Sequence, residues 1–262
     1  MLSAIIGGTG FYSIPGGVFT EELIQTPFGK AKVYRGEGEH ADLVFLARHG
    51  VNHSVPPHKI NYKANIKALQ MLGIKNVLAT FAVGSLRESV PPLGLVAIDQ
   101  FLDFTSGRPF TFHEGGKWGF DHTIMTNPYC QSLRKRLLEV ARQMALPIQS
   151  AGTYVCTNGP RLETAAEVRM FAQLGGDVVG MTGVPEAPLA RELGLHYAAV
   201  AFSINWCAGL KSDVMEMHED GLDQLKSSIL DLFTTTLRSV KIAGCECENA
   251  SLGYHPPVEE EE

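Results

Sequence analysis

Arg48 and His49 stand side by side where an apolar run ends, in the stretch ARHGVNHSVPPHKINYKAN. A buried parallel strand delivers such residues to its carboxyl end, which is where the ligand sites of α/β folds lie. A guanidinium can grip a phosphate through two parallel hydrogen bonds, and an imidazole adds a third donor. The pair therefore predicts an anion site. The alternative is a surface arginine beside a packed histidine.

A glycine-rich loop, IIGGTGFYS, follows the first apolar run of the chain. Backbone N–H groups of such loops can approach a ligand closely, and phosphate is the usual ligand. The dinucleotide fingerprint is absent because its third glycine, after Gly8 and Gly10, would fall at Ser13, and no Gly-Lys-Ser/Thr ending gives a Walker motif. The loop predicts a generic anion site with one hydroxyl, Thr9, or else an ordinary tight turn.

Metal chemistry has weak support in the sequence. His49, His53 and His58 follow one another in a Pro-rich loop, but no carboxylate or thiol joins them, as a metallohydrolase would require. The chain has five cysteines: Cys130, Cys156, Cys207, Cys245 and Cys247. They show no zinc-ligand spacing, and an odd number in a chain of this length indicates reduced thiols, although Cys245 and Cys247 could pair across a tight turn. We expect no metal.

The composition limits the classes of function. A chain of 262 residues, 45% hydrophobic and 19% charged, can bury one large core, so one domain is the default. A net charge of −6 disfavours nucleic acid or an anionic membrane surface as partner. No apolar run reaches about 18 residues, and the start MLSAIIGG lacks a basic segment and a cleavage site. These features predict a soluble cytoplasmic protein.

The elements that must position these residues alternate along the chain, which predicts an α/β fold. Strand-like apolar runs lie at 2–6, 42–48, 76–83, 94–101, 177–181 and 196–204. Helical spacing lies at 61–73, 131–144, 163–174 and 185–193, with a long terminal helix at 218–242.

Two segments lack this regularity. Residues 104–128 have no sustained period and many glycines and prolines, which predicts a long functional loop or an intersubunit arm. Residues 244–262 end in a run of glutamates and predict a mobile acidic tail after a single domain at 1–243.

Several motifs, in this order along the chain, resemble the methylthioadenosine phosphorylase and trimeric purine nucleoside phosphorylase family. They are IIGGTG, LARHG with NYKANIKAL, AVGSLRE, DQFLDFT with RP, GPRLETAAE, GMTGVPEAPLARELGL and SINWCAG, and they span residues 3–240. The resemblance implies an α/β fold with a mixed, partly barrel-like central sheet flanked by helices, a homotrimer, and no metal or organic cofactor. It also implies phosphorolysis, in which inorganic phosphate as co-substrate attacks C1′ of a purine nucleoside.

The resemblance also implies a phosphate site. Its members would be Thr9, Arg48, His49, Ala82 and Thr182, with His49 also counted as catalytic. One position departs from the family, because Phe81 stands where relatives often have Thr or Asn. A side-chain contact to phosphate is lost there, and only backbone N–H groups of residues 82–84 can replace it.

The nucleoside would lie beside the phosphate. By the same resemblance Met181 packs near the ribose and Leu162 lies against the purine. The resemblance also implies that Asn205 and Cys207 bind the substrate and that Asn205 serves as a catalytic residue. His122 would come from a neighbouring subunit to the 5′ end of the sugar, or it is a surface-loop histidine.

Three positions predict the substrate. A carboxamide at Asn205 can donate to a 6-oxo oxygen and accept from N7–H of the base, whereas adenine-specific relatives have Asp there. A carboxylate at Glu163 is satisfied by the N1–H of hypoxanthine but meets a lone pair on adenine. His218 can bond a 5′-hydroxyl but not a methylthio group; the alternative is an apolar wall made by Val214, Met215 and Met217.

These residues predict a 6-oxopurine nucleoside phosphorylase of purine salvage that acts on inosine and guanosine. The alternatives are an S-methyl-5′-thioinosine or S-methyl-5′-thioadenosine phosphorylase. A non-catalytic nucleoside-binding protein is the alternative of another class.

Overall fold

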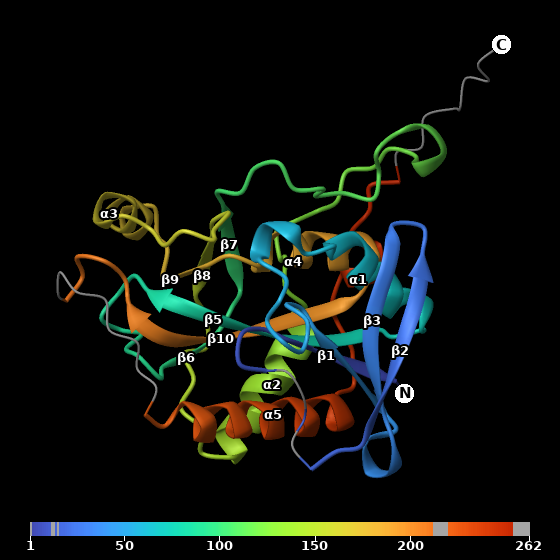
Figure 1. The fold of residues 1–262 in the computed structure, drawn as a ribbon, viewed down its shortest axis with the longest axis horizontal. Coiled ribbons are helices and arrows are strands. Elements are labelled where there is room, and N and C mark those ends of the chain that lie inside the picture. The colour runs from blue at the N-terminus through green and yellow to red at the C-terminus, as the bar shows by residue number, and fades with distance from the viewer. Residues whose placement is uncertain (1, 12–13, 15, 212–219, 254–262) are drawn as a thin grey trace.

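The fold is built on a large mixed sheet (Figure 1). The computed structural model describes residues 2–11, 14, 16–211 and 220–253. Within them the main path of the sheet runs through β2 (Phe19–Thr26), β3 (Gly29–Gly36), β4 (Leu43–Ala47), β1 (Ser3–Gly7), β5 (Asn76–Ser85), β9 (Val178–Gly180), β8 (Thr153–Cys156) and β7 (Gln100–Asp103). A branch adds β10 (His196–Trp206), which pairs with β5 and with β6 (Leu95–Ala97). The α/β fold around a mixed sheet is thus confirmed.

Helices cover both faces of the central strands (Figure 1). On one side lie α1 (Tyr62–Met71) and α4 (Gly183–Glu192), and on the other α2 (Gln131–Gln143) and α5 (Leu222–Ser239). The side chains of β5 alternate between the two cores: Val77, Ala79 and Phe81 pack on the α1/α4 side, and Leu78 packs on the α2/α5 side. This alternation is the period of a strand buried on both faces. The short helix α3 (Ala165–Gln173) lies at the end of the sheet near β8 and β9.

Local sequence signals start three of these helices. The side chain of Asn61 accepts from Ala64 N at the start of α1, and the thiol of Cys130 accepts from Leu133 N at the start of α2. At the start of α3, Thr164 and Glu167 form a reciprocal capping box. The caps place Glu163 just before α3 and Cys130 at the head of α2.

The expected elements occur with shifts of a few residues, and three strands were missed. The run 94–101 divides into β6 and β7 because β6 pairs with β10 and β7 with β8. The hairpin β2–β3 and the strand β8 were not predicted. Charged and apolar residues are mixed in both strands of the hairpin, which lies at the edge of the sheet and is partly exposed. The hairpin therefore has no continuous apolar run in the sequence.

The irregular segments also take shape. Residues 104–128 contain a short 3₁₀ turn at Gly116–Trp118 and otherwise no helix or named strand. The first part of the expected tail packs on the body, because Cys247 and Ala250 are each 2% exposed and Ile124 N donates to Ala250 O at 2.8 Å. Residues 254–262 lie outside the described residues, so the prediction for them stays a prediction. In the described part of the chain, no helix has the length and apolar character needed to span a membrane.

Candidate active site

A cavity of about 320 Å³ opens where β5 loses its neighbour along one edge. β10 covers one edge of β5 from Asn76 to Ser85. On the other edge β1 pairs only as far as Ala79, and β9 pairs only at Gly84 and Ser85. Residues 80–83 are therefore left between the ends of β1 and β9, and the loops that follow these two strands form walls of the cavity.

Most of the residues singled out from the sequence line this cavity. They are Thr9, Arg48, His49, Ala82, Leu162, Glu163, Met181, Thr182, Asn205 and Cys207. His122 does not: it is exposed, with its ring edge-on to Phe120 at 4.9 Å between ring centroids. His218 lies outside the described residues.

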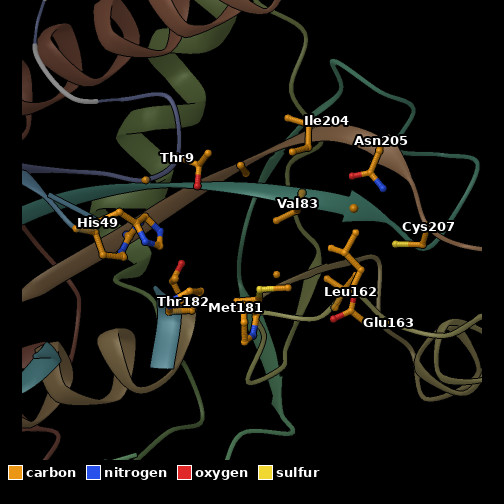
Figure 2. A pocket seen from close by; sticks show the side chains of 18 of the residues that line it. Thr9, His49, Val83, Leu162, Glu163, Met181, Thr182, Ile204, Asn205 and Cys207 are labelled. Carbon is orange, nitrogen blue, oxygen red and sulfur yellow. The ribbon is translucent and has the colours of Figure 1, made fainter. Parts of the chain in front are cut away.

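The lining residues separate into two ends (Figure 2). Thr9, His49 and Thr182 lie together at one end, and Asn205, Cys207 and Glu163 lie at the other. Met181 and Val83 lie between them. The polar hydroxyl and imidazole groups are thus separated from the amide and the carboxylate by an apolar middle, so the cavity offers polar groups at both ends of an elongated ligand.

The glycine-rich loop after β1 needs its glycines for close packing. Gly8 N donates to Thr80 Oγ1 at 2.9 Å, and a Cβ on Gly8 would lie 2.7 Å from Thr80 O and 2.9 Å from Arg48 Nη1. Gly10 adopts φ +82°, which a side chain disfavours. The loop therefore lies directly on β5 and on Arg48, and it presents Thr9 to the cavity.

Arg48 is held by a buried acid that the sequence reading missed. Its Nε and Nη2 donate to the two carboxylate oxygens of Glu186, each at 2.6 Å, and Nη1 donates to Thr80 O at 3.0 Å. Both side chains of the pair are 1% exposed. The carboxylate raises the pKa of Arg48, so the guanidinium stays charged despite its burial. Tyr197 completes the group by donating to Glu186 at 2.7 Å.

The sequence predicted that Arg48 would bind phosphate through two parallel hydrogen bonds. In the structure its Nε and Nη2 donate in parallel to the carboxylate of Glu186 instead, so that prediction is corrected. Of the five N–H bonds of a guanidinium, three are used within the protein. The signal in the sequence was Glu186 itself, a lone acid in the apolar helical stretch GVPEAPLA. A buried acid in such a helix requires a partner.

His49 is a neutral acceptor toward the cavity. Its Nδ1 lies 2.8 Å from Val55 O, and a carbonyl only accepts, so Nδ1 carries the proton. Burial, helped by the charge of Arg48, lowers the pKa of His49 to about 4. The remaining nitrogen, Nε2, therefore offers a lone pair near neutral pH. The sequence predicted that the imidazole of His49 would donate a third hydrogen bond to phosphate. The structure corrects this, because Nε2 is an acceptor when Nδ1 carries the proton.

Phe81 supplies no lining to the cavity. It is 1% exposed, its ring lies 5.1 Å from the Arg48 guanidinium carbon, and it tilts against Tyr154 at 4.9 Å. From β5 the cavity is lined instead by Ala82, Val83 and Gly84. Phe81, where relatives often have Thr or Asn, therefore packs its ring against the guanidinium of Arg48.

Thr182 and Met181 are positioned by two residues that the sequence reading did not name. The Tyr154 hydroxyl accepts from Thr182 N at 3.1 Å and from Gly183 N at 3.3 Å. Arg108 donates to Met181 O at 2.8 Å and is itself 7% exposed. The hydroxyl of Thr182 makes no capping bond to α4, so it is left to the cavity.

Asn205 and Cys207 lie at the carboxyl end of β10. The register with β5 shifts between Ser203 and Asn205, and Asn205 Nδ2 donates to Trp206 O at 2.8 Å. Cys207 packs over Gly84, where an added Cβ would lie 2.5 Å from its sulfur. Burial raises the pKa of Cys207 to about 12, so the thiol stays protonated. This end of the cavity therefore has an oriented amide beside a neutral sulfur.

Glu163 is held by a neighbour in space. Thr157 Oγ1 donates to Glu163 Oε1 at 2.7 Å. Because Thr164 is the N-cap of α3, Glu163 precedes the helix, and its carboxylate lines the cavity. Thr157 was not predicted, since only the fold brings the end of β8 to the start of α3.

Comparisons with known proteins identify the family of the chain. The family model described as "Phosphorylase superfamily" matches residues 3–238. The chain belongs to the phosphorylase superfamily. A 6-oxopurine nucleoside phosphorylase of Pyrococcus furiosus is 44% identical over 95% of this chain and 97% of its own. A probable S-methyl-5′-thioinosine phosphorylase of Methanothermobacter thermautotrophicus is 40% identical over 98% of this chain and 91% of its own.

Solved structures of this superfamily share the fold. The methylthioadenosine phosphorylase of Schistosoma mansoni in complex with tubercidin superposes with a TM-score of 0.83 at 32% identity, covering 91% of each chain. Relatives that are named for different substrates thus have similar sequence identity to this chain. The substrate must therefore be argued from the residues of the cavity.

Proposed function

We propose that this member of the phosphorylase superfamily is a 6-oxopurine nucleoside phosphorylase. In this reaction a phosphate oxygen bonds to C1′ of inosine or guanosine, the C1′–N9 bond breaks, and its electron pair leaves with the base. The observation that carries the proposal is the pairing of Asn205 with Glu163 at one end of a cavity whose other end holds Thr9, His49 and Thr182.

The phosphate would lie among Thr9, Thr182 and the open edge of β5 at Ala82. The hydroxyls donate to it, and Arg48, held in place by Glu186, supplies its positive charge and its unused N–H bonds. Nε2 of His49 accepts the O–H of hydrogen phosphate, because a neutral imidazole cannot donate there. A phosphate fixed beneath C1′ is both the nucleophile and the counter-charge for an oxocarbenium-like transition state.

The base would lie between Asn205 and Glu163, with Leu162 against it and Met181 near the ribose. Thr157 holds one oxygen of Glu163, which leaves the other for the N1–H of a 6-oxopurine. The amide of Asn205 donates to O6, which stabilises the negative charge that develops on the leaving base. The proton that hydrogen phosphate loses balances the proton that the base gains at N7, and the amide oxygen accepts from this N7–H. Adenine offers an amino group and a bare N1 to these two residues, which leaves buried polar groups unpaired.

The 5′ end of the substrate and the assembly belong to the proposal as well. His218 and, from a neighbouring subunit, His122 would bind the 5′-hydroxyl. Four large aromatic side chains of the 104–128 segment are at least 36% exposed: Phe104, Phe110, Trp118 and Phe120. Exposed aromatic residues are typical of interface cores, and they support a homotrimer that buries this arm. Purine salvage in the cytoplasm is the expected setting.

One assay tests the function. Release of base from inosine, guanosine, adenosine, methylthioinosine and methylthioadenosine is measured with and without inorganic phosphate. We expect phosphate-dependent release of hypoxanthine and guanine, with ribose 1-phosphate as the second product. Binding of nucleosides without phosphate-dependent cleavage would indicate the non-catalytic alternative.

A further inference from the structure

A second cluster of chemically active side chains lies at the opposite end of β10 from the active site. It consists of Cys130, His196, Cys245 and Cys247. His196 begins β10 and Asn205 lies near its end. At about 3.3 Å of rise per residue, the two lie about 30 Å apart. The cluster therefore takes no part in the chemistry proposed for the cavity.

The four ligand atoms lie close to one another. The three sulfurs and the histidine nitrogen are all within 4.8 Å of each other. His196 Nδ1 is 3.8 Å from Cys130 Sγ and 3.5 Å from Cys245 Sγ. A tetrahedral zinc ion with ordinary bond lengths places a sulfur and a nitrogen ligand about 3.6 Å apart. The two sulfur–nitrogen distances in the structure lie within about 0.2 Å of that separation.

Donors and positive charge surround the sulfurs. Arg191, which is 4% exposed, donates from Nη1 to Cys247 Sγ at 3.5 Å and is held by Ile124 O at 2.9 Å. Cys130 heads α2, and its sulfur accepts from Leu133 N at 3.4 Å. Three thiolates and one Zn²⁺ carry one net negative charge, which the guanidinium of Arg191 balances.

We propose that Cys130, His196, Cys245 and Cys247 bind one structural zinc ion. Three cysteines and one histidine form a closed tetrahedral set without an open position for water, which is the pattern of structural rather than catalytic zinc. Cys130, His196 and Cys247 are buried, and Cys245 is partly exposed. The ion would fasten the segment after α5 to the head of α2 and the start of β10.

This site revises the expectation of no metal. Sequence reading looks for ligand pairs at short spacing, but here His196 is 66 residues from Cys130 and 49 from Cys245. Only Cys245 and Cys247 are near neighbours. The fold brings the remaining ligands together, so their spacing along the chain carries no signal.

Metal content of the full chain tests the proposal without reference to activity. The protein is isolated under reducing, anaerobic conditions with Zn²⁺ supplied, and zinc per chain is measured after removal of loosely bound ions. We expect one zinc per chain. Replacement by Co²⁺ should give the intense visible bands of a tetrahedral site and thiolate-to-cobalt charge transfer. Substoichiometric zinc together with an octahedral cobalt spectrum would overturn the proposal.

Variants assign the ion to this cluster. Cys245→Ser changes the most exposed ligand and is the least disruptive to folding; it should weaken metal binding at least about a hundredfold, because even outer partners of a ligand contribute 10–100-fold. Arg191→Gln should weaken it about tenfold or more. The matched control is Glu246→Gln, which changes the exposed residue between the two cysteines and should keep one zinc and the cobalt spectrum.

Two further results would contradict zinc binding by this cluster. Zinc retained in full by Cys245→Ser and Cys247→Ser would place the ion elsewhere. A disulfide between any two of the three cysteines, found by mass spectrometry in the anaerobic, zinc-supplied protein, would show that the thiols pair with each other. A zinc-dependent rise of the melting temperature in the unmodified protein and in Glu246→Gln, but not in Cys245→Ser, would support it.

Discussion

Arg48 and Glu186 form a two-bond ion pair, 1% exposed, and Arg48 lines the same cavity as Thr9, His49 and Thr182. Two buried charges gain little net stability from such a pair, but one charge left without its partner is costly. The pair fixes a positive charge beside Gly8 and Thr80. Its stability role and its proposed role toward phosphate can be separated by mutation.

Arg48→Met should remove both roles. The orphaned carboxylate of Glu186 should lower the free energy of unfolding by about 3–5 kcal/mol. Loss of the charge should lower kcat/KM for phosphate by about 10²–10³-fold. Denaturant titration and initial rates at varied phosphate measure the two effects.

The double variant Arg48→Met with Glu186→Leu is the control that separates them. With both charges gone it should recover part of the lost stability, while Tyr197 lacks its acceptor. Phosphate-dependent turnover should remain low. Recovery of normal phosphate kinetics in the double variant would show that Arg48 has no part in binding the anion.

The neutral state of His49 predicts a pH dependence of stability. Its folded pKa, about 4, lies below the ordinary value of 6.5, so between these values the unfolded chain binds a proton that the folded chain does not. The contribution is complete above the unfolded value and falls as the pH drops from about 6.5 to about 4, by at most about 3 kcal/mol. Unfolding of the unmodified protein and of His49→Gln in phosphate-free buffer measures it.

The variant should lose less stability than the unmodified protein as the pH falls. His58→Gln changes an exposed histidine of the same loop and serves as the control. It should follow the unmodified protein across the whole range. Parallel curves for all three proteins would mean that His49 titrates normally.

Thr157 is predicted to position Glu163. Thr157→Val keeps the shape but removes the hydroxyl that donates to Glu163 Oε1 at 2.7 Å. One lost hydrogen bond of about 1 kcal/mol should reduce the preference for inosine over adenosine about fivefold. Thr157→Ser retains the hydroxyl and should restore the preference. An unchanged ratio of kcat/KM values in Thr157→Val would show that Glu163 needs no such support.

The sequence predicted elements and members of the cavity better than their contacts. Arg48, His49 and Asn205 could be placed because they stand at the ends of apolar runs, and parallel strands bring such ends together. Glu186 and Thr157 could not, because they act through neighbours that only the fold supplies. The protonation of His49 depends on burial and on Val55 O, which no local pattern encodes.

Exchange of the two residues that we propose to recognise the base, Asn205 and Glu163, tests the substrate proposal most directly. Asn205→Asp with Glu163→Ser presents a carboxylate to an amino group and removes the acceptor that N1–H requires. Each mismatch with a 6-oxopurine is worth about 1–3 kcal/mol, so the double variant should move the preference toward adenosine by about 10²-fold or more. Ratios of kcat/KM for inosine, adenosine and their 5′-methylthio forms measure the change, and the methylthio forms separate the effect of the base from that of the 5′ group.

The unmodified protein should prefer the 6-oxo member of each pair. Preference of the unmodified protein for methylthioadenosine over methylthioinosine would refute the assignment of Asn205 and Glu163, because these two substrates differ only at the base.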